Sequence, residues 1–364
     1  MTSTVRLGEQ ARVAALDEAV SLDELRLAAR NHGMPLEALR DDLTPPGLHY
    51  LLVHYDIPFV DPASWRLTIG GHVYSPIELD LAALTARPRV ETVVTLECAG
   101  NGRARLLPRP VSQPWLDEAV GTARWAGTPL APLLRESGLL DGAVDVVFTG
   151  HDHGTERGVE QDYQRALPIE EALGSDVLLA YEMNGAPLPP QHGAPVRLVV
   201  PGWYGMTHVK WLRDITVLAS RFTGYQNAVA YRLRADADDP GEPVTRILPR
   251  ALMMPPGFPD FMTRRRIVDA GSLVLRGRAW SGRAPVVRVE LSTDGGQSWT
   301  DAALGESLGR HAWRSWSARW DAIRGEYELC VRATDEVGAQ PVDPLWNLQG
   351  MANNMVQRMA VTVR

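Results

Sequence analysis

Hydrophobic and polar residues alternate in short runs over the last quarter of the chain, from Ser272 to Arg364. Successive side chains of a β-strand point to opposite faces, so this alternation predicts half-buried strands. Turn sequences such as Asp-Gly-Gly at 294–296 separate the runs. About 90 residues with this rhythm predict a small β-sandwich of immunoglobulin type.

Strand-like and helix-like segments are mixed before residue 250. Apolar runs that end in glycine-rich turns predict strands at 65–73, 90–100 and 144–154. Apolar residues at helical spacing predict a polar helical segment over residues 1–40 with a stop at Gly33, and short helices at 80–86, 129–138 and 168–175. The mixture predicts an α+β domain over residues 1–250. The immunoglobulin-like domain is then expected over residues 251–364, after a proline-rich connector at 248–266.

Composition and charge narrow the class of protein. The 364 residues are enough for two domains, and the 45% that are hydrophobic can bury a core of ordinary size. The formal net charge of −7 argues against nucleic acid or an acidic membrane as a partner. The sequence has no apolar stretch of about 18 residues and no secretory or twin-arginine signal, so we expect a cytoplasmic protein without membrane contacts.

One of the two cysteines, Cys98, lies in the segment Thr-Leu-Glu-Cys-Ala-Gly-Asn-Gly-Arg. A lone cysteine is most often a small buried hydrophobic residue. Here an apolar run precedes it, glycines follow, and Arg103 and Arg105 are near enough in sequence to favour a thiolate. Cys330 falls in the middle of an expected strand, and zinc would need more ligands nearby. A single thiolate therefore fits a transition metal whose other ligands come from an organic cofactor.

Segments of both expected domains resemble the sulfite oxidase family of molybdopterin-dependent oxidoreductases, in a form without a haem domain. They are 95–103, 178–212, 286–302 and 344–354. The resemblance runs from about residue 35 to the end and implies a molybdopterin-binding α+β domain followed by an immunoglobulin-like domain. It also implies that Cys98 ligates the molybdenum of a molybdenum–molybdopterin cofactor.

Family members usually dimerise through the immunoglobulin-like domain, so the resemblance implies a homodimer. Exposed tryptophans suit an interface between protein chains. The tryptophans of this domain, Trp313, Trp316 and Trp320, could serve such an interface or equally belong to the core.

The resemblance further implies a set of residues that hold the pterin. A ligand with a phosphate and many hydrogen-bonding atoms needs cations and small polar groups around it, and Lys210 is the only lysine among 37 basic residues. Each residue taken alone could instead be a surface charge or a core histidine. The implied cofactor-binding residues are Tyr55, Asp56, Asp152, His192, Arg197, His208, Val209 and Lys210.

Five more residues match or replace family positions at the substrate site. Tyr231 matches an active-site tyrosine, which can donate a hydrogen bond to an oxyanion. Arg103 matches an arginine of the anion pocket, and Trp115 matches a tryptophan that lines it. His54 and Gln349 stand where the family has arginines, and each lost charge-assisted hydrogen bond is worth about 1.5–3 kcal/mol. A histidine keeps part of the charge below its ordinary pKa of about 6.5.

The implied activity is oxygen-atom transfer to or from a small oxyanion or S-oxide, with oxidation of sulfite to sulfate favoured. No haem-attachment sequence is present, so electrons are expected to pass to an external acceptor, a cytochrome or dioxygen. One alternative is a molybdenum-dependent reductase of S-oxides or N-oxides, because a neutral substrate needs fewer cations. The other is a non-catalytic protein that binds the cofactor.

Overall fold

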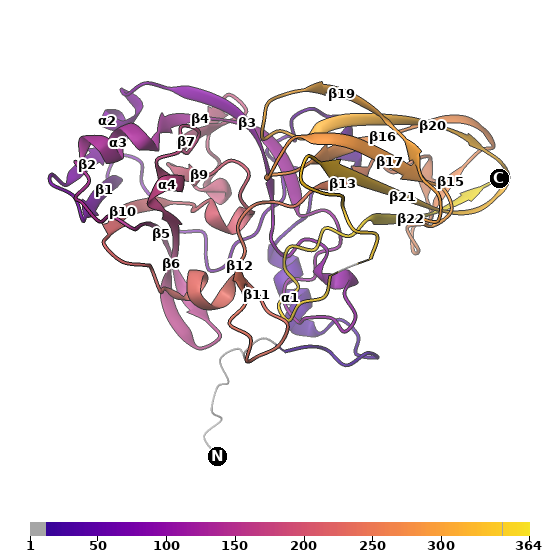
Figure 1. Cartoon of the computed structure of the whole chain (residues 1–364), viewed down its shortest axis with the longest axis horizontal. Coiled ribbons are helices and arrows are strands. Elements are labelled where there is room, and N and C mark those ends of the chain that lie inside the picture. The colour runs from indigo at the N-terminus through magenta and orange to yellow at the C-terminus, as the bar shows by residue number, and fades with distance from the viewer. Residues whose placement is uncertain (1–11, 344) are drawn as a thin grey trace, which may run out of the picture.

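The computed structural model describes residues 12–343 and 345–364, which form two lobes side by side (Figure 1). The first lobe, up to residue 249, combines two larger β-sheets with short helices. The second lobe, from residue 250, is a sandwich of two sheets, and the C-terminus lies at its far end (Figure 1). The predicted order of an α+β domain and an immunoglobulin-like β-sandwich is confirmed.

One sheet of the first lobe has five strands in the order β2-β1-β10-β5-β6. β1 and β10 run parallel, with Thr68 opposite Asp214, and the other neighbours are antiparallel. Apolar side chains such as Ile69 and Phe148 are fully buried against the second sheet and the short helices. The strands are β1 Arg66–Gly71, β2 Ile77–Asp80, β5 Asp145–Glu156, β6 Val159–Pro168 and β10 Leu212–Leu218.

The other sheet of the first lobe carries the Cys98 segment. Its order is β3-β4-β7-β8, with β9 also paired to β7. Strand β3 begins at the surface, and its last four residues are buried, so it delivers Cys98 into the interior. The strands are β3 Val90–Glu97, β4 Val120–Pro129, β7 Leu178–Met183, β8 Ala186–Pro187 and β9 Arg197–Val199; a separate small hairpin pairs β11 Arg232–Leu233 with β12 Glu242–Pro243.

The helices of the first lobe are short. The polar helical segment expected before Gly33 is confirmed only as α1, because Ser21 and Glu24 form a capping box that starts the helix there; residues 1–11 lie outside the described residues. None of the described helices is long and apolar enough to cross a membrane. The helices are α1 Leu22–Arg30, α2 Leu81–Thr85, α3 Leu130–Glu136 and α4 Ile169–Ala172, with single turns η1 Leu36–Arg40, η2 Arg103–Arg105, η3 Pro190–His192, η4 Gly205–Thr207 and η5 Gln226–Ala230.

The sandwich pairs a four-stranded sheet, β13-β16-β20-β19, with a six-stranded sheet, β14-β15-β22-β21-β17-β18. The segment expected as a connector contains strand, because Arg250–Met253 pairs with β16 and so belongs to the sandwich. The strands are β13 Arg250–Met253, β14 Phe258–Pro259, β15 Arg266–Val268, β16 Gly271–Trp280, β17 Val286–Ser292, β18 Thr300–Asp301, β19 Ala303–Ser307, β20 Arg314–Ala322, β21 Gly325–Asp335 and β22 Gln357–Val363.

The three tryptophans that were candidates for a dimer interface are buried within the chain. Trp316 and Trp320 belong to the sandwich core, with Leu329 and Val331. Trp313 packs between the lobes, and its backbone N–H donates to Thr95 Oγ1 at 2.7 Å. All three side chains are buried inside the chain, so the core interpretation holds and the interface interpretation of these residues is wrong.

Candidate active site

Cys98 lies in a tight turn directly after β3. Its backbone N–H donates to the carbonyl of Ala119 at 2.9 Å, and its carbonyl accepts from the N–H of Asn101 at 3.0 Å. Cys98 is 7% exposed, and burial raises the pKa of its thiol while the positive charge of Arg103 opposes the rise. The guanidinium favours the thiolate form of the buried thiol, and a metal ion can replace the thiol proton at such a site.

Two cavities meet at this thiol. One lies over the segment from η3 to η4, and polar and charged groups make up much of its lining. The other, with a volume of about 690 Å³, is lined by residues of α1, the first lobe and the second lobe. Four residues line both cavities, and they are Leu52, His54, Cys98 and Tyr231. Chemistry at the thiol is therefore accessible from two sides.

Five of the predicted cofactor-binding residues gather around the first cavity: Asp152, His192, Arg197, His208 and Lys210. Arg197 lies over the ring of Trp125 at 4.8 Å and donates to the carbonyl of His192 at 2.9 Å. Lys210 Nζ donates to the carbonyl of Leu52 at 2.6 Å. Residues from 152 to 210 thus converge on one wall.

Burial changes the ionisation of this wall. It lowers the pKa of Lys210 to about 7, and the charge of Arg197 adds to that effect. It also lowers the pKa of Arg197 to about 10 and raises that of Asp152 to about 6. Positive groups placed together and away from water favour an anionic ligand, because the ligand would restore the charge balance that burial disturbs.

Three buried polar atoms of residues that line the first cavity have no hydrogen-bond partner among the described residues. They are Arg197 Nε, Asp152 Oδ1 and His49 Nε2. Buried polar atoms are nearly always paired in folded proteins. Unpaired donors and acceptors on one wall indicate a missing ligand with complementary polar atoms.

His54 and Tyr231 form a hydrogen-bonded pair between the two cavities. His54 Nε2 lies 2.8 Å from the Tyr231 hydroxyl. Burial lowers the pKa of His54 to about 4, so His54 does not supply the cation that an arginine at this position would carry at neutral pH. Burial also raises the pKa of Tyr231 well above its ordinary value, so its hydroxyl keeps its proton.

Arg103 lies on the second-cavity side of the thiol. Its Nε donates to the carbonyl of Gln349 at 2.9 Å, and its Nη1 donates to the carbonyl of Gln113 at 3.1 Å. The guanidinium lies against Gly100, where an added Cβ would be 2.5 Å from Arg103 Nη2. Trp115 lines the same cavity. All five predicted substrate-site residues are therefore brought together, including Gln349 from the second lobe.

Three predicted cofactor residues lie elsewhere. The Asp56 side chain is 94% exposed and faces Arg30 at 3.4 Å, away from both cavities. The Val209 side chain is fully buried in the core of the first lobe. Tyr55 lines the second cavity, with its ring against Gly154. The segment 54–56 turns at this point, so neighbouring residues point to different environments.

The structure also brings in residues that the sequence did not single out. His49 lines the first cavity, and its ring lies 5.5 Å from that of His192. Glu156 and Arg157, at the turn between β5 and β6, line the second cavity. Arg157 has a positive φ of 50°, and the Arg157-Gly158 pair was a turn signal that could have marked this hairpin. Nothing in the local sequence pointed to His49.

Two protein-family models match the chain. The model of the oxidoreductase molybdopterin binding domain matches residues 54–226, and that of the Mo-co oxidoreductase dimerisation domain matches residues 261–364. Sulfite oxidase of Gallus gallus is 37% identical, over 89% of this chain and 74% of that protein. The chain belongs to the sulfite oxidase family. Mitochondrial sulfite oxidase of Mus musculus is 34% identical, over 95% of this chain and 67% of that protein.

The chain is also similar to plant nitrate reductases. NADH nitrate reductase 1 of Oryza sativa subsp. japonica is 31% identical over 88% of this chain, which spans 38% of that protein. The chain spans 63% of the human mitochondrial sulfite oxidase. Among solved structures, the sulfane dehydrogenase SoxCD from Paracoccus pantotrophus has a TM-score of 0.79 at 24% identity, covering 100% of this chain and 97% of that one. This last likeness concerns the fold.

Membership of the sulfite oxidase family implies a molybdenum–molybdopterin cofactor, and the polar and charged groups that line the first cavity fit the chemistry of this group. The cavity is lined by one thiol, by the guanidinium of Arg197 and the amino group of Lys210, and by several unpaired polar atoms. A pterin needs donors and acceptors, its phosphate needs cations, and molybdenum needs a soft ligand. Cys98, Arg197 and Lys210 offer these three features in one cavity.

Proposed function

We propose that the protein oxidises sulfite to sulfate by oxygen-atom transfer and passes the electrons to an external acceptor. The observation that carries this proposal is the meeting of the two cavities at Cys98, with Arg103, His54 and Tyr231 around the thiol. The bound cofactor would supply the oxygen-transfer and redox chemistry. The residues of the chain bind and orient the substrate.

Arg103 and Tyr231 have distinct tasks in this proposal. Arg103 attracts the oxyanion and fixes its direction, because its guanidinium is held by the carbonyls of Gln349 and Gln113. In the tautomer with its proton on Nε2, the neutral His54 donates to the Tyr231 oxygen. The phenol hydrogen of Tyr231 is then free to point into the cavity and to donate to a substrate oxygen.

Metal analysis followed by an assay tests the proposal. Purified protein should contain about one molybdenum per chain and should reduce ferricyanide when sulfite is added. The Cys98→Ser variant should stay folded and lose both the molybdenum and the activity, because a serine hydroxyl is a poor ligand for a soft metal site. Molybdenum retained by Cys98→Ser would contradict the role of the thiol. Full molybdenum content in the native protein with no turnover of any oxyanion or S-oxide would favour the non-catalytic alternative.

The second cavity favours a second candidate, the reduction of an S-oxide or N-oxide. Its volume of about 690 Å³ is in the range of pockets that enclose whole organic ligands, and sulfite has only four heavy atoms. Of the three positions where the family places cations, only Arg103 is charged at neutral pH here, since His54 and Gln349 are neutral. A side-by-side assay with sulfite as donor and methionine sulfoxide as acceptor distinguishes the two directions.

We also propose a homodimer formed through the second lobe, on the basis of the match to a dimerisation domain. A dimer mass in sedimentation or light scattering would support it, and a monomer at micromolar concentration would contradict it. The cytoplasmic location and the identity of the electron acceptor, a cytochrome or dioxygen, stay predictions.

A further inference from the structure

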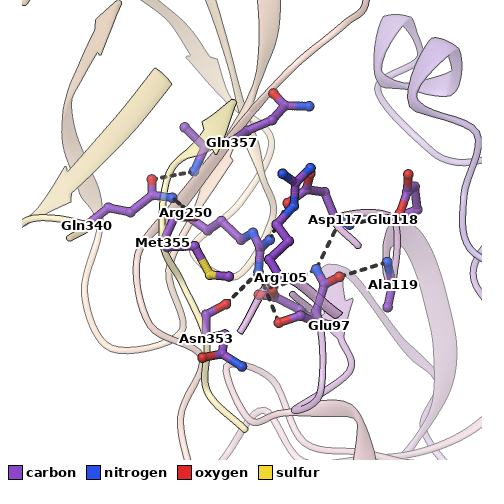
Figure 2. A network of polar contacts seen from close by, with 12 residues as sticks. Glu97, Arg105, Asp117, Glu118, Ala119, Arg250, Gln340, Asn353, Met355 and Gln357 are labelled. Carbon is purple, nitrogen blue, oxygen red and sulfur yellow. Dashed lines mark hydrogen bonds and ion pairs between the residues drawn. The ribbon is translucent and has the colours of Figure 1, made fainter. Parts of the chain in front are cut away.

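A single arginine of the second lobe reaches into the segment that carries Cys98. Arg250, the first residue of β13, is fully buried. Its Nη1 donates to Glu97 Oε1 at 3.1 Å and to the carbonyl of Asn353 at 2.7 Å. Its Nη2 donates to Asp117 Oδ1 at 2.9 Å (Figure 2). The guanidinium thus joins the end of β3, the segment before β4 and the C-terminal segment.

Glu97, which Arg250 binds, directly precedes Cys98. The other oxygen of its carboxylate accepts from Trp280 Nε1 at 2.8 Å, also from the second lobe. Glu97 Oε1 accepts from Asn101 Nδ2 at 3.0 Å. Asn101 is the residue whose backbone N–H closes the turn on the carbonyl of Cys98. One carboxylate therefore holds both ends of the four-residue turn that carries the thiol.

The second lobe also contacts the middle of this turn. The N–H of Ala352 donates to the carbonyl of Ala99 at 2.7 Å. The neighbouring residue, Asn353, is the one whose carbonyl accepts from Arg250. Arg250 consequently fixes the Cys98 turn and the C-terminal segment that covers it with the same guanidinium.

The network is balanced in charge but built from groups that are costly to bury. Glu97 and Asp117 carry two negative charges, and Arg250 and Arg105 carry two positive charges, with Arg105 bound to Asp117 Oδ2. Apolar side chains of similar volume would join two lobes at least as firmly as buried ions. Charged groups with fixed hydrogen-bond directions also determine the positions of the residues that they bind. Here they determine the position of the turn that carries the Cys98 thiol.

We propose that Arg250 is a positioning residue for Cys98, and that the second lobe is thereby a structural part of the metal site as well as a dimerisation domain. The inference rests on the proposed role of Cys98 as the metal-binding thiolate. Without Arg250, the turn 98–101 opens more often, and the thiol departs from the position in which it adjoins both cavities.

Thiol reactivity in the cofactor-free full chain tests this inference. The rate of Cys98 alkylation by iodoacetamide is measured by peptide mass spectrometry, which separates it from the buried Cys330. The Arg250→Met variant should react at least about tenfold faster, which corresponds to about 1.4 kcal/mol in the opening equilibrium of the turn. Arg250→Lys keeps the charge but not the forked donor, so its alkylation rate should lie between those of the native protein and Arg250→Met.

Two further variants guard the interpretation. Trp280→Phe removes the indole donor to Glu97 but keeps an aromatic ring, and should accelerate alkylation by about threefold even if Arg250→Met fails to fold. Leu329→Ala destabilises the sandwich core away from the turn, and should leave the rate within twofold of the native rate. A rate of Cys98 alkylation that is unchanged in Arg250→Lys and in Trp280→Phe would overturn the proposal. So would a rate in Leu329→Ala as high as that in the Arg250 variants.

A second measurement connects the turn to the metal. The molybdenum content of cofactor-loaded Arg250→Met should be less than half of the native content, whereas Leu329→Ala should load normally. Equal loading of both variants would contradict the positioning role. If Cys98→Ser kept its molybdenum while Arg250→Met still accelerated alkylation, the proposed function would fail and the control of the turn by Arg250 would stand.

Discussion

Mild acid is expected to unfold the cofactor-free protein, because four histidines are buried in the neutral form in and around the first cavity. Burial is the main cause of each low pKa. In the unfolded chain each imidazole has a pKa of about 6.5. In the folded chain the values are about 4 for His49 and His54, about 3 for His208 and about 2 for His192.

Proton linkage gives the size of the effect. Below pH 6.5 the unfolded chain binds protons that the folded chain excludes, so the free energy of unfolding falls as the pH falls. Each histidine lowers the free energy of unfolding by about 2 kcal/mol between pH 8 and pH 5. The loss is about 1.4 kcal/mol per pH unit over the 1.5 units between pH 6.5 and pH 5. The four histidines together lower the free energy of unfolding by about 8 kcal/mol. The whole free energy of unfolding of a typical domain is only about 5–15 kcal/mol.

The Lys210–Asp152 pair does not change this result. The pKa of Lys210 is lowered to about 7, so its destabilising effect grows as the pH falls from 8 to 5. The pKa of Asp152 is raised to about 6, so its destabilising effect is relieved over the same range. The two changes have opposite sign and similar size, about 1.4 kcal/mol each, and they cancel.

Urea unfolding followed by tryptophan fluorescence at pH 8, 7, 6 and 5.5 measures the slope. Below about pH 6 the free energy of unfolding should fall by about 4 kcal/mol per pH unit, the value for four histidine protons less the one that Asp152 takes up in the folded chain. His208 is the informative variant, because its Nδ1 accepts from the N–H of Val200 and its Nε2 donates to the carbonyl of Trp203, which leaves no place for a second ring proton. His208→Gln should reduce the slope by about a third, and the exposed His32→Gln should leave it unchanged.

Two results would refute this reasoning. One is a change of less than about 2 kcal/mol in the free energy of unfolding between pH 8 and pH 5. The other is a His208→Gln variant with the same slope as the native protein. Either result would mean that these imidazoles accept protons in the folded state, and that the first cavity is wetter than its burial indicates.

Three variants extend the predictions to the site. Tyr231→Phe removes the donor that His54 orients, and turnover should fall about 100-fold with little change in the melting temperature; equal turnover would exclude the phenol from the reaction. Gly100→Ala places a Cβ against the Arg103 guanidinium, and KM for sulfite should rise about tenfold or more in steady-state assays while molybdenum content holds. Lys210→Met removes a buried ammonium, so the cofactor-free protein should gain about 1–3 kcal/mol in urea unfolding while molybdenum content falls; a gain in both would contradict its role in binding.

Much of the fold was predictable from local pattern. The alternation after Ser272 predicted the sandwich strands, and the glycine-rich turns placed the ends of β3 and β5 close to where they are observed. Periodicity records which face of an element is buried, and that preference is local. The Cys98 turn was recognisable for the same reason, since its glycines and arginines are neighbours in the chain.

Long-range contacts were not predictable in this way. Arg250 was assigned to the first domain, near the start of the expected connector, yet it starts a sandwich strand and binds Glu97, 153 residues earlier in the chain. Asp56 matched a family position but is exposed, and His49 matched no pattern but lines the first cavity. The linear sequence determined the elements and the thiol turn. The tertiary structure alone decided the cavities, the neutral state of His54 and the buried ion network, because burial and distance between remote residues set pKa values and hydrogen bonds.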